Sequence, residues 1–307
     1  MVLLRQPGGT ALDIERLNAA LKHGGIEIAR TVPAGEGMDS GLDPKALRAE
    51  RVWAVVTACP RALPPATVEA LESAGVRVMA EADLRERELA RVDIEALPAG
   101  WLAGARAVRE GMFERAMRRV LDVVCCVGLV AVTLPVIIVA AVAIRIDSPG
   151  PIFYRQARVG RGNRVFQCYK FRSMRTDAEV AGQAVWASKD DKRVTRVGRW
   201  LRLTRIDEIP QVINVLRGDM HFVGPRPERP EFVEKLGLQI AHYHDRAAVK
   251  PGITGWAQVN YPYGASIEDA RMKLSYDLYY VRRRSLFLDL LILVSTVRVI
   301  LFQEGAR

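Results

Sequence analysis

The stretch "VVCCVGLVAVTLPVIIVAAVAI", residues 123–144, decides the fold, because 22 consecutive residues carry no charge. About twenty apolar residues suffice for a helix to cross a bilayer, so this run predicts contact with a membrane. Arginines flank the run on both sides, and the positive-inside rule therefore favours the cytoplasm for both of its ends. These arginines are Arg115, Arg118 and Arg119 before the run and Arg145, Arg155, Arg158 and Arg161 after it.

Pro135 lies near the middle of this run. A proline inside a helix removes one backbone hydrogen bond and kinks the helix, and the hydroxyl of Thr133 can satisfy a freed carbonyl. Each half is too short to cross a bilayer at about 1.5 Å per residue. We therefore expect a re-entrant membrane helix over residues 120–146, kinked at Pro135. A straight spanning helix and a buried core helix are the alternatives.

The chain of 307 residues has a formal net charge of +10, and the excess is concentrated after residue 110. Residues 111–307 hold 31 Lys and Arg against 19 Asp and Glu. With 50% hydrophobic residues the chain can bury a core, which argues against disorder. The basic part should seek phosphates, anionic lipid or nucleic acid.

A second apolar segment, "SLFLDLLILVSTVRVILF", covers residues 285–302 and is interrupted by Asp289 and Arg298. This composition favours a helix in the membrane interface, with the arginines at 282–284 near anionic head groups. A core helix of the soluble part is an equally good interpretation.

The amino-terminal part predicts a small α/β, Rossmann-like domain. Residues 51–59 and 76–80 are typical of short strands, and residues 64–75 between them are typical of a helix. This βαβ pattern indicates a parallel sheet, but no GxGxxG follows the first strand, so nothing supports dinucleotide binding. We expect an α+β protein. It would have an accessory domain at residues 1–95, a linker and juxtamembrane helix at 96–119, the re-entrant helix at 120–146, and a mainly helical catalytic domain with a β-hairpin at 147–307.

The segment "TRIDEIPQ", residues 204–211, places two adjacent carboxylates among arginines. Asp207 can act as the N-cap of a helix that Gly218 ends, with Glu208 and Pro210 in its first turn. The alternative is chemistry, because a carboxylate can attack phosphorus while cations offset the charge of a diphosphate. Magnesium would relieve the repulsion between the two carboxylates.

Basic residues surround this pair in the sequence. Lys170 lies on the second strand of a hairpin expected around "GRGN", residues 160–163. The arginines of "RVTRVGRWLRLTR", residues 193–205, recur every third residue and put Arg202 and Arg205 beside the acidic pair. Arg226 lies in a Gly- and Pro-rich loop, and "VKPGITGWAQVNYPYG" is a second such loop. Rigid loops of this kind are more often the walls of a site than linkers.

Taken in order, these motifs resemble the bacterial sugar transferases, the monotopic phosphoglycosyl transferases. The resemblance covers about residues 111–307. It is carried by the re-entrant apolar helix and by "SPGPIFYRQARVG", "YKFRSMRTDAE", "RVGRWLRLTRIDEIPQVINVLRGDMHFVGPRPERP", "VKPGITGWAQV" and "KLSYDLYYVRRRS". It implies transfer of a sugar 1-phosphate from a UDP-sugar to undecaprenyl phosphate at the cytoplasmic face of the bacterial inner membrane, the first step of exopolysaccharide or related glycan assembly.

The resemblance also implies the roles of individual residues. Asp207 would be the nucleophile that forms a covalent phosphosugar intermediate and releases UMP. Glu208 would be its partner in holding Mg²⁺ or in deprotonating the lipid phosphate. Lys170, Arg202 and Arg226 would hold the diphosphate and the polyprenyl phosphate. Arg205, beside the acidic pair, is grouped with these substrate-binding residues.

Two rival functions remain. One is a membrane-bound glycosyl transferase that releases UDP in place of UMP, and the other is a basic scaffold at the membrane surface without chemistry. Nucleic-acid binding is disfavoured, because an acidic pair among the arginines would weaken phosphate binding. The expected partners are therefore a UDP-sugar, undecaprenyl phosphate and anionic inner-membrane lipids. If the protein associates with itself, we expect a homodimer.

Overall fold

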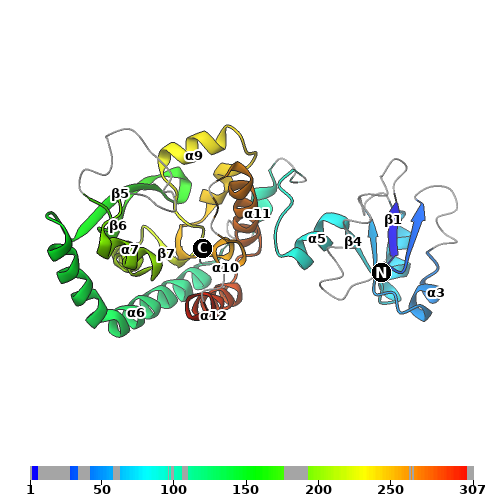
Figure 1. The fold of residues 1–307 in the computed structure, drawn as a ribbon. Helices are drawn as coiled ribbons and strands as arrows, with labels where there is room; N and C mark the ends of the chain where they lie inside the picture. Colours follow the sequence, from blue (N-terminus) through cyan, green and yellow to red (C-terminus); the bar gives the residue numbers. More distant parts are fainter. Residues whose placement is uncertain are drawn as a thin grey trace. The chain divides into compact units, whose positions relative to one another are not determined.

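The computed structural model describes residues 2–5, 28–33, 42–57, 63–95, 97, 100–105, 110–175, 193–262, 264 and 266–302. The chain divides into two compact units, Met1–Leu97 and Pro98–Arg307. Figure 1 shows the order of their elements along the sequence. Each unit is described by itself below.

The first unit contains a parallel sheet with strand order β2-β1-β3-β4. The predicted strand, helix and strand at residues 51–80 are confirmed, although each is shorter than expected. The assignment to a Rossmann-like fold stays a prediction. The strands are β1 (Val2–Arg5), β2 (Arg30–Pro33), β3 (Ala54–Thr57) and β4 (Arg77–Ala80), and the helices are α3 (Pro44–Ala49), α4 (Pro65–Ser73) and α5 (Glu81–Leu89).

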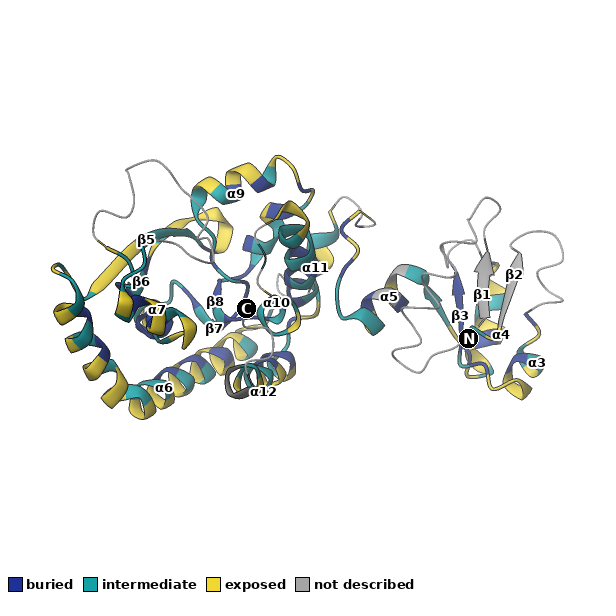
Figure 2. Cartoon of the chain, in the orientation of Figure 1, coloured by how far each residue is buried: buried dark blue, intermediate teal, exposed yellow. Residues whose placement is uncertain are grey.

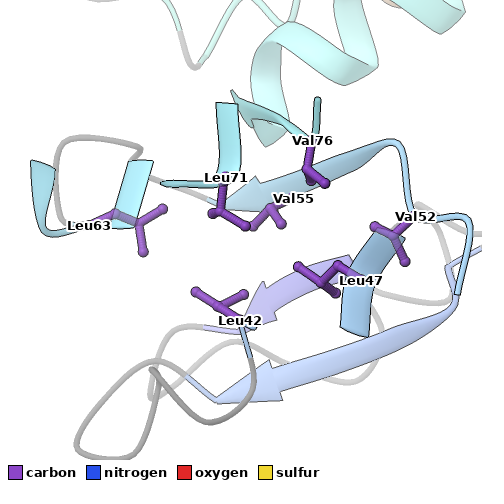
Figure 3. Packing of buried hydrophobic residues seen from close by; sticks show 7 residues of the cluster. All are labelled: Leu42, Leu47, Val52, Val55, Leu63, Leu71 and Val76. Carbon is purple, nitrogen blue, oxygen red and sulfur yellow. The ribbon is translucent and has the colours of Figure 1, made fainter. Parts of the chain in front are cut away.

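The core of this unit forms where α3 and α4 meet strand β3. Val55 on β3 is fully buried against Leu47 of α3 and Leu71 of α4 (Figure 3). The same cluster includes Leu42, Val52, Leu63 and Val76. These aliphatic side chains supply the apolar burial that holds short helices onto short strands.

The second unit is mainly helical with two small sheets, and it contains the long apolar helix. The predicted hairpin is confirmed: β5 (Phe153–Val159) pairs antiparallel with β6 (Val165–Phe171) across η3 (Arg161–Asn163). The sequence did not predict β7 (His221–Val223) and β8 (Gly252–Thr254), which form a parallel pair inside the two loops rich in Gly and Pro. The remaining elements are η2 (Trp101–Gly104), α6 (Met112–Asp147), α7 (Arg196–Leu203), η4 (Ile206–Gln211), α8 (Val212–Arg217), α9 (Pro230–Gly237), η5 (Tyr243–Ala248), α10 (Trp256–Asn260), α11 (Ile267–Arg283) and α12 (Leu286–Phe302).

Helix α6 is one continuous helix of 36 residues whose length and apolar composition are sufficient to cross a membrane. From Arg118 to Ile144, one face of it is buried or packed against the rest of the unit. Near its start, Asp122 accepts hydrogen bonds from the Phe222 backbone N–H (2.8 Å) and contacts the His221 ring. At its end, Asp147 accepts from the N–H of Val197 at 3.1 Å. The other face is exposed (Figure 2), and the exposed residues from Val120 to Val142 are all apolar.

Pro135 lies inside α6, and the helix axis changes direction along its length in Figure 1. Proline at this position removes the hydrogen bond to the carbonyl of Ala131, four residues earlier. We expected Thr133 to satisfy a freed carbonyl, but its hydroxyl donates to the carbonyl of Leu129 at 2.6 Å. A threonine that bonds back to residue i−4 tends to bend a helix, so Thr133 and Pro135 act on the same turn.

Arg172 closes the carboxyl end of α6. Its guanidinium donates to the carbonyls of Pro149 (3.1 Å), Ile144 (3.2 Å) and Ser148 (2.6 Å), and also reaches the Ser148 hydroxyl at 3.0 Å. Ser148 and Pro149 follow the helix, and Ile144 also accepts from the Ser148 N–H, so Arg172 mainly satisfies carbonyls just beyond α6 while its charge complements the helix dipole. Arg172 thus joins the hairpin to the membrane helix.

Helix α7 approaches the end of β6 closely because residue 198 is a glycine. A Cβ atom at Gly198 would lie 2.0 Å from the carbonyl oxygen of Ser173. Of the five arginines that recur every third residue in 193–205, α7 carries Arg196, Arg199 and Arg202. Arg205 comes after the helix in the left-handed region, with φ of 60°.

Helix α12 combines the two alternatives for the carboxyl-terminal segment. Asp289 and Ile292 are buried against the unit, whereas Phe287 and Val294 are exposed. Arg284 is also buried and donates to Glu110 at 3.2 Å. The expectation that it lies near lipid head groups is therefore wrong, because an internal carboxylate holds it.

We predict that Arg172→Met lowers the free energy of unfolding by about 3 kcal/mol, since it removes the guanidinium donor from the carbonyls of Ser148 and Pro149 just after α6. Thermal unfolding of the purified protein in detergent measures this. Arg199→Met, at an exposed position on α7, is the matched control and should unfold like the wild type. Equal unfolding temperatures for both variants would contradict the capping role of Arg172.

Candidate active site

The acidic pair lies on η4, a 3₁₀ helix, and both carboxylates are buried. We interpreted Asp207 as a possible N-cap, but the cap position belongs to Arg205, and both acids fall in the first turn of η4. Gly218 ends the following helix α8 in the left-handed conformation, as predicted. A positive φ at a non-glycine residue costs free energy and persists only where the surrounding structure enforces it. The backbone of Arg205 therefore sets the direction in which η4 begins.

Glu208 is paired with two cations. Arg226 donates to its carboxylate from both terminal nitrogens, and Nη1 lies 3.1 Å from Oε2. Lys170 Nζ donates to Oε1 at 3.0 Å. Burial disfavours the charged form of this side chain, but the charges of Arg226 and Lys170 outweigh it and hold the pKa of Glu208 well below its usual range. Glu208 is therefore an anion that orients two cations and is a poor general base.

Asp207 is in the opposite situation. Its residue is 8% exposed and lines the same cavity, yet its carboxylate forms no hydrogen bond or ion pair with the residues that the structure describes. Burial and the neighbouring charge of Glu208 raise the pKa of Asp207, while Lys170, Arg226 and Arg202 act to lower it. Two adjacent carboxylates thus have different environments: Glu208 is ion-paired with two cations, whereas Asp207 can contact a ligand in the cavity.

Asn214, which the sequence analysis overlooked, fixes the acidic pair against the hairpin. This fully buried side chain accepts from the N–H of Tyr169 at 3.0 Å and donates to the carbonyl of Gln167 at 2.7 Å. It bonds to β6 as a neighbouring strand would, which places η4 and α8 beside Lys170. An asparagine inside a short amphipathic helix gives no pattern from which this role could be predicted.

Arg226 is held in turn by Arg246, which the sequence analysis also missed. Arg246 donates to the carbonyl of Arg226 at 2.9 Å and to the carboxylate of Asp277 on α11 at 2.7 Å. Burial raises the pKa of Asp277 to about 6, although Arg246 opposes this. The spacing of charges on "KLSYDLYYVRRRS" could have indicated an inward-facing acid, because Asp277 interrupts the apolar face of α11.

The structure brings the predicted site residues together around one cavity of about 1350 Å³. Asp207, Glu208, Lys170 and Arg226 form its charged centre. The remaining two predicted substrate-binding residues, Arg202 and Arg205, also line it. Pro135 is not among the residues that line this cavity, whereas its neighbour Thr133 is.

The same carboxylates bear on the expected magnesium site. Within the described ranges, no group of three or more His, Cys, Asp and Glu side chains could hold a metal ion. Magnesium needs less than this, because it is often held by one or two carboxylates together with substrate phosphates. Cations occupy both oxygens of Glu208, so the carboxylate of Asp207, which has no partner in the part of the chain that the structure describes, is the group that fits such an ion.

A family model described as "Bacterial sugar transferase" matches residues 113–303. The chain is 47% identical over 191 residues to the UDP-N-acetylgalactosamine-undecaprenyl-phosphate N-acetylgalactosaminephosphotransferase of Aeromonas hydrophila, covering 62% of this chain and 45% of that protein. It is 44% identical over 190 residues to the UDP-glucose:undecaprenyl-phosphate glucose-1-phosphate transferase of Xanthomonas campestris pv. campestris, covering 61% and 38%. A protein of the same description from Caulobacter vibrioides is 42% identical, covering 62% of this chain and 71% of the relative. The match spans less than half the length of the first two relatives.

We predict that Arg226→Met destabilises the fold by about 3 kcal/mol, because it removes one partner from a buried ion pair and leaves Glu208 undercompensated. The double variant Arg226→Met with Glu208→Gln should recover most of this loss, since the buried negative charge is then absent. Unfolding of the two single variants, the double variant and the wild type completes the cycle. Losses that simply add would contradict a direct coupling between the two side chains.

Proposed function

Because the chain belongs to the bacterial sugar transferase family, we propose that it transfers a sugar 1-phosphate from a UDP-sugar to undecaprenyl phosphate. The observation that carries this proposal is the buried carboxylate of Asp207, which has no hydrogen-bond or ion-pair partner among the described residues and lines a cavity with Lys170, Arg202 and Arg226. Such a site combines a nucleophile with fixed cations for a diphosphate. These features fit phosphoryl transfer better than they fit a basic membrane scaffold that catalyses no reaction.

In the first step, an oxygen of Asp207 attacks the phosphorus that carries the sugar. The bond from this phosphorus to the bridging oxygen breaks, and UMP leaves with that oxygen and its electron pair. The product is a phosphosugar linked to Asp207 as an acyl phosphate. Arg202 and Arg205, which line the cavity beside the acidic pair, stabilise the charge on the departing phosphate.

In the second step, a phosphate oxygen of the polyprenyl acceptor attacks the same phosphorus. The bond to Asp207 breaks, which regenerates the carboxylate and gives undecaprenyl diphosphate sugar. Glu208 keeps Arg226 and Lys170 in place through both steps, because its charge stays buried between them. We assign Glu208 a positioning role, since its low pKa argues against general base catalysis.

Asp207 would hold a magnesium ion together with the phosphate oxygens of the substrate. The chemistry that magnesium supplies here is neutralisation of the diphosphate, which lowers the repulsion that the approaching carboxylate meets. The cationic side chains of the cavity supply the same kind of stabilisation from fixed positions.

We place the protein on the cytoplasmic face of the inner membrane, with α6 as a re-entrant helix. Contacts of Asp122 near the start of α6 and Asp147 at its end with the same unit support this placement. A helix that crossed the bilayer straight would draw that unit, with its buried and exposed charges, into the hydrocarbon layer. Exposed Arg196 and Arg199 beside Trp200 on α7 fit contact with anionic lipid.

The role in exopolysaccharide assembly rests on the resemblance of the motifs, and the sugar is a separate question. Among the relatives described above, one is named for N-acetylgalactosamine and two for glucose. A panel of UDP-sugars therefore belongs in the assay. A glycosyl transferase would release UDP, so the nucleotide product separates the two reactions.

We predict that Asp207→Asn lowers UMP release by about a thousandfold or more, because an amide cannot form the acyl phosphate. The assay combines purified protein, a UDP-sugar panel, undecaprenyl phosphate and magnesium, and it separates UMP from UDP. Binding of the variant to liposomes should be unchanged, which excludes a loss of membrane contact. UMP release by the variant at the wild-type rate would remove Asp207 as the nucleophile.

The raised pKa of Asp207 predicts the pH dependence of the first step. Only the ionised carboxylate attacks, so the rate of UMP release falls as the pH drops through this pKa. Glu208→Gln removes the adjacent negative charge, and Asp207 is then the carboxylate that Arg226 and Lys170 stabilise. The pKa of Asp207 therefore falls, and the acid limb of the rate profile moves to lower pH. Comparing the two pH profiles tests this. An acid limb that stays in place or moves upward would refute the coupling.

A further inference from the structure

The cavity that contains the acidic pair has a second wall of different chemistry. It is built from two apolar helices: Cys125, Leu129 and Thr133 of α6, and Leu293, Thr296 and Val297 of α12. Phe222 and Ile253, from the strands β7 and β8, complete it. Helices α6 and α12 are joined by the ion pair of Arg118 with Asp289 near their starts, and the residues of this wall all line the same cavity. We call these eight residues the apolar wall.

The threonines of the apolar wall do not make it polar, because their hydroxyl protons are already used. Thr133 donates to the carbonyl of Leu129 and Thr296 donates to the carbonyl of Ile292, at 2.6 and 2.7 Å. The Thr254 hydroxyl, which also lines the cavity, lies 2.7 Å from the Thr296 hydroxyl and must therefore be the donor in that bond. These side chains offer methyl groups to a ligand and no hydrogen-bond donor.

The apolar wall reaches the part of the surface that we place in the membrane. Val297 lines the cavity and is also 56% exposed, so it lies at the rim. Leu290 and Val294 continue from it along the exposed side of α12, and both lie outside the cavity. The exposed residues of α6 from Val120 to Val142 are apolar as well. The cavity thus opens beside surfaces that suit acyl chains and ends at the charged centre.

We propose that the apolar wall binds the isoprenoid chain of the polyprenyl phosphate acceptor and guides its phosphate to Asp207. This inference rests on the proposed function. A nucleoside or a sugar would leave its hydroxyl and amide groups unpaired against such a wall. An isoprenoid has no polar group to desolvate, and its methyl branches gain the contacts that α6 and α12 provide. The charged side of the cavity is left for the nucleotide.

The test separates the two half-reactions with two tryptophan variants of α12. Val297→Trp places a bulky ring at the rim of the cavity, whereas Val294→Trp places the same ring on the same helix outside it. In a single turnover without acceptor, both variants and the wild type should release one equivalent of UMP. With acceptor, Val297→Trp should raise the KM for undecaprenyl phosphate about tenfold or more, and Val294→Trp should leave it unchanged.

The possible failures are distinguishable. No UMP burst from the wild type overturns the proposed function itself. A normal burst with an unchanged KM in Val297→Trp, or with equal effects of both variants, overturns the assignment of the apolar wall. Loss of the burst in Val297→Trp alone also overturns it, because the rim would then serve the nucleotide sugar.

Cys125 provides a readout that does not depend on activity. Its thiol lines the cavity, so N-ethylmaleimide should label it, and Cys125→Ser identifies the labelled position in a mass spectrum. Undecaprenyl phosphate should slow this labelling at least about tenfold, and phosphatidylglycerol at the same concentration should not. Equal protection by both lipids would mean a general lipid contact, and no protection by undecaprenyl phosphate would place the chain elsewhere. Either result overturns the proposal.

Discussion

The pairing of Glu208 with Arg226 and Lys170 is the interaction on which the rest of the site depends. It joins three segments that are far apart in the sequence: the hairpin strand β6, the 3₁₀ helix η4, and the loop after β7. Removing Lys170 or Arg226 leaves the buried carboxylate of Glu208 without full compensation, whereas the two cations are themselves only partly buried. The same pairing separates the chemistry of two neighbouring carboxylates. Glu208 is held as an anion, and Asp207 forms no hydrogen bond or ion pair with any described residue, although Lys170, Arg202 and Arg226 lie near it.

Much of this arrangement could be predicted from the sequence, because it follows from periodicity and turn chemistry. The apolar run gave α6, the "GRGN" turn gave the hairpin, and Gly218 marked the end of α8. The order of the motifs indicated which acids and cations meet. Strands β7 and β8 could not be found in this way, since three residues are too few for a period and both lie among glycines and prolines. The 3₁₀ form of η4 is equally local and depends on the strained residue Arg205.

The arginines show why a charge count alone predicts a site poorly. The basic excess after residue 110 indicated binding of phosphates or lipids, yet several of these guanidinium groups act inside the protein. Arg172 and Arg119 bind carbonyls at the ends of α6 and α8, and Arg118, Arg246 and Arg284 bind buried carboxylates. The sequence cannot distinguish these roles, because the orphan carbonyls and the inward-facing acids are defined only once the helices have packed. The cations that we propose to face the substrate all line the cavity, and they are Lys170, Arg202, Arg205 and Arg226.

The buried arginines also explain how a membrane helix can serve as part of an active site. An apolar helix held only by aliphatic contacts would exchange them for lipid at little cost, because lipid chains are as apolar as its own side chains. Helix α6 is held by Arg118 and Asp122 near its start and by Arg172 at its end, and none of these bonds can be replaced by lipid. Its position relative to Asp207 is therefore fixed by polar contacts on one face, while the opposite face is free to contact the bilayer. The same helix can then present one face to the membrane and a second, with Cys125, Leu129 and Thr133, to the cavity in which the phosphosugar would be transferred.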